Sequence, residues 1–149
     1  MKKYVFILIL ILPVICLSQV NDPQIYDMAF YRIEQAFRDA SPNSLWPLFS
    51  SRMTIRIEDS LYQNIPDIQT EFLLKRFFQN KDSLEFRFEG KFFHFGSAKG
   101  NGIITYIFNK KRESLNVDVY LNDWRGEVLI SDINISNYPS STAFYNFSK

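Results

Sequence analysis

The best candidates for catalysis in this 149-residue sequence are an acid and a phenol two positions apart. A carboxylate base in an apolar cavity, with a tyrosine as oxyanion partner, is the arrangement that isomerases and dehydratases use for proton transfer. Asp118 and Tyr120 have these types. They alternate, however, with three aliphatic residues of the same predicted strand, which are Leu115, Val117 and Val119. If the aliphatic side chains face the core, the pair faces outward. We therefore expect a solvated or interface surface there, with catalysis as the less favoured alternative.

The histidine and cysteine content excludes several other chemistries. Cys16 is the only cysteine and His94 the only histidine. A zinc site built from several histidine or thiolate ligands is therefore excluded, and a serine- or cysteine-type triad would depend on His94 alone. His94 lies in the aromatic run of residues 92–95, where a structural histidine at a strand or turn end is favoured over a general base. We expect no metal and no cofactor.

Four aromatic residues are candidates for lining a ligand pocket: Tyr31, Trp46, Tyr106 and Trp124. Pockets for small molecules are lined mainly by apolar and aromatic side chains. Aromatic residues make up 17% of the chain, however, so most of them must belong to the core. For each of the four, a core position is favoured over a ligand contact.

The N-terminus has the three zones of a secretory signal peptide. Lys2 and Lys3 precede an apolar run over residues 4–17, and Ser18 precedes a candidate cleavage site before Gln19. The run of 14 residues is shorter than the roughly 20 that span a membrane. We expect cleavage after residue 18, export to the periplasm or the extracellular space, and no stable membrane anchor. A retained anchor and lipid attachment at Cys16 are the alternatives.

Cleavage would leave 131 residues, which is the size of one domain. The whole chain has 17 basic and 16 acidic residues, and the predicted signal peptide carries two lysines and no acid. The remaining charge is close to neutral, whereas a domain that binds nucleic acid carries a basic face. We expect one domain over residues 19–136, no nucleic-acid partner, and a C-terminal tail over residues 137–149 that packs loosely or forms an interface.

The hydrophobic periodicity predicts helices in the N-terminal half of the chain. Between residues 23 and 40, apolar residues recur at steps of three and four, which places them on one stripe of a helix: Tyr26, Ala29, Phe30, Ile33, Ala36 and Phe37. We expect a short second helix at residues 42–49, a strand at 53–58, an extended piece near 61–63, and a third helix at 67–80.

The C-terminal half predicts a sheet. Alternating or apolar runs suggest strands, which lie at residues 84–89, 103–108, 115–121 and 128–135. The aromatic run of residues 92–95 leads toward a predicted Gly-rich turn at residues 96–102, and further turns are expected at 109–113 and 122–126. Helices followed by strands predict an α+β fold, in which N-terminal helices pack on one face of a curved, mainly antiparallel sheet.

This order of elements resembles the nuclear-transport-factor-like fold, a cone-shaped α+β fold also called cystatin-like. Within it, residues 27–135 resemble a family of exported bacterial domains of unknown function. The resemblance is carried by positions that begin or end elements, which are Ala36, Phe37, Leu48, Phe49, Phe77, Phe78 and the last strand at residues 129–135. Because these are core positions, the resemblance implies a fold and no activity. It also implies a possible pocket between the long helix and the sheet.

Three functions are compatible with this fold. We favour a non-catalytic exported module that binds a partner protein or helps assembly in the bacterial cell envelope. The alternatives are a carrier of a small apolar ligand in the cone pocket and, less favoured, an isomerase- or dehydratase-type enzyme. A cone filled by side chains would favour the module, an open cavity the carrier, and a buried dry carboxylate the enzyme.

One predicted strand is apolar on both faces. Ile103 and Ile107 point to one side, while Ile104, Tyr106 and Phe108 point to the other. Residues 128–130 repeat this feature. A single layer of helices covers only one side of the sheet, and soluble monomers rarely keep a large apolar patch exposed. We expect a homodimer through this sheet face, with the folded-back tail as the alternative cover.

Overall fold

The computed structural model describes residues 23–137. Its elements, in chain order, are α1 (Pro23–Arg38), the 3₁₀ helix η1 (Pro42–Leu48), β1 (Phe49–Ile57), β2 (Ser60–Ile65), α2 (Asp67–Phe78), β3 (Asp82–His94), β4 (Ser97–Phe108), β5 (Lys111–Trp124) and β6 (Glu127–Ser136). The predicted signal peptide and nearly all of the predicted tail lie outside the described residues.

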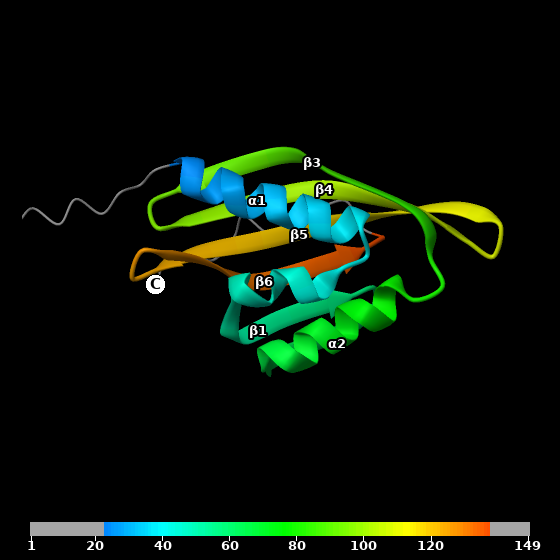
Figure 1. Ribbon diagram of the computed structural model, residues 1–149, viewed down its shortest axis with the longest axis horizontal. Helices are drawn as coiled ribbons and strands as arrows, with labels where there is room; N and C mark the ends of the chain where they lie inside the picture. The colour runs from blue at the N-terminus through cyan, green and yellow to red at the C-terminus, as the bar shows by residue number, and fades with distance from the viewer. Residues whose placement is uncertain (1–22, 138–149) are drawn as a thin grey trace, which may run out of the picture.

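The described helices all lie on one face of a six-stranded sheet (Figure 1). The strand order is β2-β1-β6-β5-β4-β3, and every neighbouring pair is antiparallel except β1 and β6, which are parallel. Helix α1 packs mainly against β3, and α2 packs against β1. This is the predicted α+β architecture, with helices on one face of a curved, mainly antiparallel sheet.

Irregularities in the strand pairing help to curve the sheet around the helices. The register shifts between Phe88 and Gly90 where β3 pairs with β4, and between Tyr120 and Leu121 where β5 pairs with β6. An extra residue in one strand bends that strand and increases its twist. The curved sheet and the helices together enclose the core.

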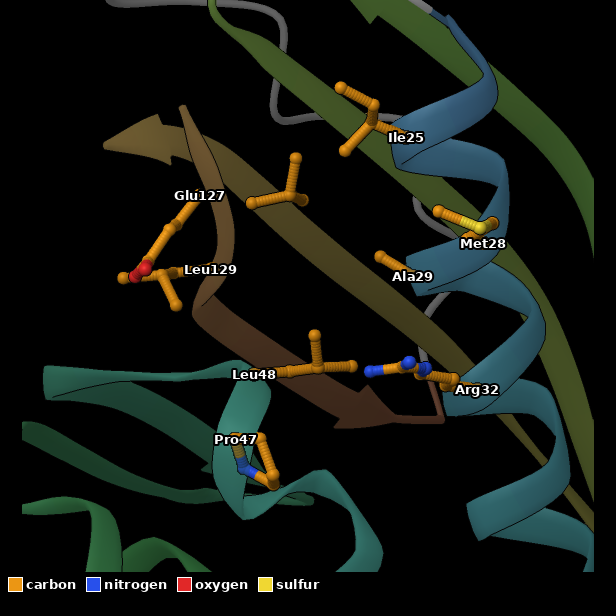
Figure 2. Close-up of a pocket in the computed structure, with 9 residues that line it drawn as sticks. Ile25, Met28, Ala29, Arg32, Pro47, Leu48, Glu127 and Leu129 are labelled. Atoms are coloured by element: carbon orange, nitrogen blue, oxygen red, sulfur yellow. The ribbon is translucent and has the colours of Figure 1, made fainter. Parts of the chain in front are cut away.

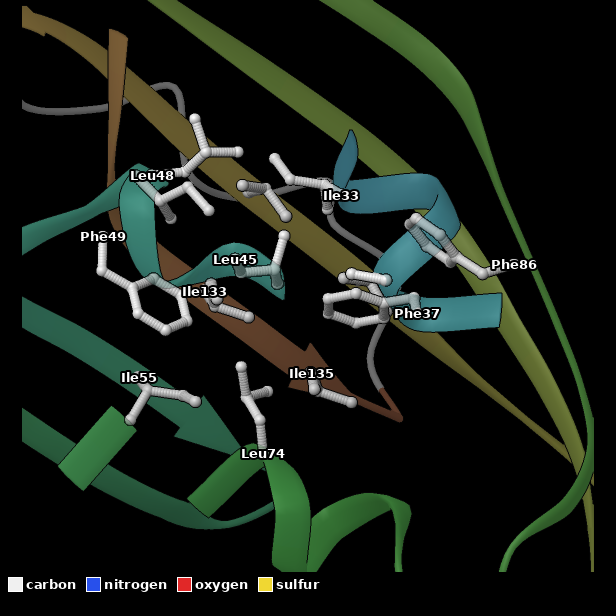
Figure 3. Close-up of a cluster of buried hydrophobic side chains, with 14 of the residues drawn as sticks. Ile33, Phe37, Leu45, Leu48, Phe49, Ile55, Leu74, Phe86, Ile133 and Ile135 are labelled. Carbon is white, nitrogen blue, oxygen red and sulfur yellow. The ribbon is translucent and has the colours of Figure 1, made fainter. Parts of the chain in front are cut away.

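The space between the helices and the sheet is filled by side chains (Figure 3). Phe30, Ile33 and Phe37 of α1 have no exposed surface. The ring of Phe37 lies 5.3 Å from that of Phe78 and 4.9 Å from that of Phe86, centroid to centroid. Other side chains in this layer are at most 1% exposed: Leu45, Met53, Ile55, Leu74, Ile104, Val117, Val119, Leu121, Ile130, Ile133 and Ile135. The centre of the cone is therefore a packed core.

The Gly-rich segment is a strand, so the prediction of a turn over residues 96–102 is wrong. Strand β4 begins at Ser97, and of the glycines in this segment only Gly96 has a positive φ, of +72°. A Cβ at Gly100 would lie 2.6 Å from Cε1 of Phe30. A Cβ at Gly102 would lie 2.3 Å from the carbonyl oxygen of Arg87. Glycine at these two positions makes room for α1 and for the neighbouring strand.

The other predicted turns are tighter than expected. Asn109 and Lys110 have φ values of 49° and 63°, and β5 begins at the next residue. Arg125 and Gly126, with φ values of 56° and 87°, connect β5 to β6. Two central residues with positive φ are typical of hairpin turns that match the twist of the strands.

Candidate functional site

A groove opens on the helix side of the molecule, between the first half of α1, the end of η1 and the start of β6 (Figure 2). Its volume is about 290 Å³. Apolar side chains form most of its wall, contributed by Met28 and Ala29 from α1, Leu48 from η1, and Val128 from β6. Val128 belongs to the segment that we expected to carry apolar residues on both faces of the sheet.

The spacing of residues on α1 explains its share of the groove. Met28 and Ala29 lie three and four residues after Ile25, and Arg32 lies four and three residues after them, so all four share one side of the helix. This side is adjacent to the buried stripe. On the opposite wall, Glu127 is the first residue of β6, directly after the hairpin turn.

A positive charge flanks the groove. In Figure 2, the side chain of Arg32 extends from α1 toward Leu48, whereas the side chain of Glu127 extends from β6 away from α1. Within residues 23–137, neither side chain takes part in an ion pair. The groove therefore combines an apolar wall with a guanidinium on the α1 side.

Asp118 lies on the face of the sheet away from the helices, as its alternation with the buried Val117 and Val119 predicts. It is only 4% exposed, and the ammonium group of Lys99 lies 3.5 Å from its Oδ1 atom. Burial raises the pKa of Asp118, and the contact with Lys99 opposes this shift. Tyr120 is half-buried, with its ring centroid 5.1 Å from the same ammonium group. We expected a solvated or an interface surface at this position. Because Asp118 is buried, the solvated alternative is wrong for it.

A polar row crosses this outer face of the sheet. Asn101 on β4 and Asn134 on β6 are the register neighbours of Asp118. The Oδ1 atoms of all three side chains are buried, and that of Asp118 forms the ion pair with Lys99. Ile103 and Ile107 lie on the same face, where they are half-buried and exposed, respectively. The outer face is therefore not the continuous apolar patch that we expected, and the homodimer stays a prediction.

The structure does not bring the four aromatic candidates together. Tyr31 is 62% exposed on α1, and Trp124 is 65% exposed near the turn between β5 and β6. Trp46 donates a hydrogen bond from Nε1 to Oδ2 of Asp67, at 2.7 Å, and lowers the pKa of that carboxyl. Tyr106 is 2% exposed and belongs to the core. None of the four lines the groove, and their role as ligand contacts stays a prediction.

Tyr106 is part of an aromatic site that the chain occupies with its own lysine. The ammonium group of Lys81 lies 4.3, 5.0 and 5.7 Å from the ring centroids of Phe77, Tyr106 and Phe108, respectively. It also donates a hydrogen bond to the carbonyl oxygen of Phe77. Burial lowers the pKa of Lys81, and burial together with Glu113 raises the pKa of Tyr106 to about 12. This cluster connects the end of α2 to β4.

The remaining features expected from the sequence are His94, a metal site and a membrane span. His94 is the last residue of β3, at the turn into β4, as predicted, and its side chain is exposed. Within residues 23–137, no three His, Cys, Asp or Glu side chains gather in a way that could hold a metal ion. None of the described helices is long and apolar enough to cross a membrane.

The groove was not predicted from the sequence, although α1 carries a signal for it. Ile25 and Met28 are apolar but lie beside the buried stripe rather than on it, and Arg32 continues their row. An apolar row next to a core stripe indicates a second contact surface on the same helix.

Comparison with known proteins identifies the family. The profile of a domain of unknown function, DUF4783, matches residues 30–136. The chain belongs to the DUF4783 family. No curated protein matches this DUF4783 chain.

Solved structures share the fold of this DUF4783 domain. A DUF4783 family protein from Bacteroides uniformis is 14% identical, with a TM-score of 0.65, and the match covers 73% of this chain and 96% of that one. An NTF-2 like protein of unknown function from Shewanella oneidensis is 9% identical, with a TM-score of 0.60 and coverages of 77% and 98%. An LEH-like epoxide hydrolase from M. tuberculosis is 12% identical, with a TM-score of 0.58 and coverages of 76% and 78%. These likenesses establish the NTF-2 like fold that the resemblance implied.

Proposed function

We propose that this DUF4783 protein is an exported, non-catalytic binding module that docks a partner protein on its helix side. The observation that carries the proposal is the filled cone. Phe30, Ile33 and Phe37 occupy the space between α1 and the sheet and have no exposed surface. A ligand or substrate would have to displace these side chains to enter. The outside of the domain is therefore the favoured binding surface.

The buried carboxylates of the described residues also favour binding over catalysis. An isomerase-type enzyme needs a carboxylate that faces its substrate in a dry cavity. Asp118 pairs with Lys99 on the outer face of the sheet, and Glu71 pairs with Lys75 along α2. Neither carboxylate lines the groove. The epoxide hydrolase is similar in fold alone, so its activity does not transfer to this chain.

Large apolar side chains are exposed on all three described helices. We call this set the helix-side surface and define it as Met28, Trp46, Ile68 and Phe72, which are 54–62% exposed. Ile68 and Phe72 are one helical turn apart on α2. Exposed apolar patches mark interaction sites, and aromatic residues and methionine are enriched in protein interfaces. The helix-side surface supports a macromolecular partner.

The groove supports a second candidate function, the carrier of a small apolar ligand. Its volume of about 290 Å³ lies near the lower end of small-molecule sites, which span roughly 300–1,000 Å³. The groove lies on the surface beside η1 rather than in the centre of the cone. A carrier that binds its ligand in this groove would not need a pocket inside the cone.

Site-specific photo-crosslinking in the producing cells tests the proposed function. A photo-reactive amino acid replaces Met28 or Phe72 on the helix side, and Lys110 in the turn between β4 and β5 serves as the exposed control. We expect one discrete protein adduct from each of the two helix-side positions and none from Lys110. Adducts from Lys110 alone, or equal adducts from all three positions, would contradict helix-side docking. The absence of adducts from both helix-side positions would also contradict it.

Intact-mass measurement of the exported protein tests the localisation. We expect a mature chain that begins at Gln19, because a small residue, Ser18, ends the short apolar run. A lipid adduct on Cys16, or a membrane-bound species that still begins at Met1, would overturn this expectation.

A further inference from the structure

We infer that the groove recognises a carboxylate beside an apolar side chain on the partner protein, and that Arg32 binds this carboxylate. The inference rests on the proposed function and names the chemistry of the segment that the groove accepts. Two features carry it: the charge of Arg32 and the apolar wall.

Arg32 differs from the other charged residues of α1. Asp27 pairs with Lys91 at 3.0 Å, and Glu34 pairs with Arg38 at 2.6 Å. Arg32 forms no ion pair with any residue between 23 and 137. A guanidinium with a free fork of N–H donors matches a carboxylate, which can accept two parallel hydrogen bonds from it.

The sequence around Arg32 explains why it has no helical ion pair. The positions three and four residues away on α1 are Met28, Ala29, Gln35 and Ala36, none of which carries a charge. Its side chain extends into the groove toward Leu48 instead (Figure 2). The stem of an arginine packs along apolar surface while its head stays available for a charged group.

The apolar wall sets the size of the neighbouring group. The groove volume of about 290 Å³ is roughly twice that of the 150 Å³ cavity that accepts benzene in an engineered protein core. Met28, Leu48 and Val128 line it. One or two large apolar side chains of a partner would fill this space and leave their backbone at the open side.

Arg32 gives the groove a direction. Its guanidinium lies on the α1 side, so the acidic group of a bound segment lies toward α1.

The surroundings of the groove favour a partner protein over a free fatty acid. Small-molecule sites bury 70–90% of their ligand, whereas this groove lies open on the surface beside η1. Met28 on its rim is 62% exposed, and Trp46 on η1 is 54% exposed. A protein segment, unlike a small ligand, could fill the groove and also cover exposed apolar side chains of this kind.

Methyl NMR on the mature protein gives a direct test. After signal cleavage the chain has two methionines, Met28 in the groove wall and Met53 in the core, where it is 1% exposed. Methyl-labelled methionine therefore yields one reporter for the groove and one for the fold. The probes are N-acetyl-Leu-Leu-Asp-amide, its isosteric Asn analogue, and octanoate.

We expect the Asp peptide to shift the Met28 methyl signal saturably and to leave the Met53 signal unchanged. The Asn analogue should bind about tenfold more weakly, because it lacks the charge that strengthens the hydrogen bonds from Arg32. Arg32→Gln should abolish this difference, and Arg32→Lys should retain part of it. Arg38→Gln, on the same helix, is the control and should leave the difference unchanged.

Equal affinity for the Asp and Asn peptides would overturn the inference, as would a preference for Asp that survives Arg32→Gln. Tighter binding of octanoate than of the Asp peptide would assign the groove to a free fatty acid and overturn the protein partner. No shift of Met28 with any probe would overturn the inference as well. Photo-adducts from Met28 and Phe72 in cells would still support the proposed function in that case, so the two failures are distinguishable.

Discussion

Replacing Gly100 by alanine tests how α1 packs on β4. The new Cβ would lie 2.6 Å from Cε1 of Phe30 and 2.7 Å from Cε1 of Phe88. These distances are about 1 Å shorter than an ordinary carbon–carbon contact. The two rings also make an edge-to-face contact, with their centroids 4.9 Å apart, and Phe30 has no exposed surface. Overpacked cores lose about 1–3 kcal/mol, and we expect Gly100→Ala to lose about 2 kcal/mol of unfolding free energy.

Urea unfolding followed by far-UV circular dichroism measures this loss. In a Phe30→Leu background the nearest clashing atom is removed, so Gly100→Ala should cost about 1 kcal/mol less than in the wild type. Gly96→Ala is the turn control, because no atom lies within 4 Å of its Cβ and only its positive φ is strained. Strictly additive costs of the Gly100 and Phe30 changes would refute the packing argument. A neutral Gly100→Ala would refute it as well.

Two further predictions concern the core and the buried ion pair. Phe37→Ala should lose about 3–5 kcal/mol of unfolding free energy, because the ring of Phe37 is fully buried. Phe72→Ala removes the same atoms from a side chain that is 62% exposed, so it should lose under about 1 kcal/mol in the same unfolding assay. Burial raises the pKa of Asp118 above 3.8, so the folded protein keeps a proton that the unfolded chain has released. Relative to Asp118→Asn, the wild type should therefore lose stability as the pH rises from about 3 through the raised pKa of Asp118, and a gain would contradict the direction of the shift.

The features that the sequence predicts correctly are those that depend on local periodicity. The stripe on α1 shows which side of that helix is buried, and the alternation of Asp118 with Val117 and Val119 shows which face of β5 is buried. Neither assignment requires knowing which element packs against that face. The element order then predicts an α+β layer arrangement, which the structure confirms. Periodicity is a property of a segment, so it can be seen before the segment has any tertiary contact.

The wrong turn at residues 96–102 shows where local information ends. Glycine serves both in turns and where two parts of a chain approach closely. At Gly100 the close neighbour is Phe30, which lies 70 positions earlier in the chain. No property of the segment itself distinguishes the two uses, because the distinction lies in the tertiary packing.

The polar row on the outer face could not be predicted for a related reason. Lys99 lies in the Gly-rich segment that was predicted as a turn, where a lysine is expected to be exposed. In the structure β4 begins at Ser97, so Lys99 belongs to a strand. Only the register that aligns Asn101 with Asp118, and Asp118 with Asn134, brings these side chains together. A buried ion pair between strands depends on pairing and register, which alternation alone does not specify.

The groove and the core are coupled because both use α1. Phe30 faces inward and contacts the sheet at Gly100, while Met28 and Arg32 lie on the neighbouring side of the same helix. A helix that is displaced by a new Cβ at Gly100 carries its groove residues with it, because close-packed interiors transmit strain. Gly100→Ala should therefore shift the Met28 methyl signal of the free protein and weaken binding of the Asp peptide, although it changes no groove residue. An unchanged Met28 signal in a destabilised Gly100→Ala protein would show that the strain is absorbed by β3 and Phe88 instead.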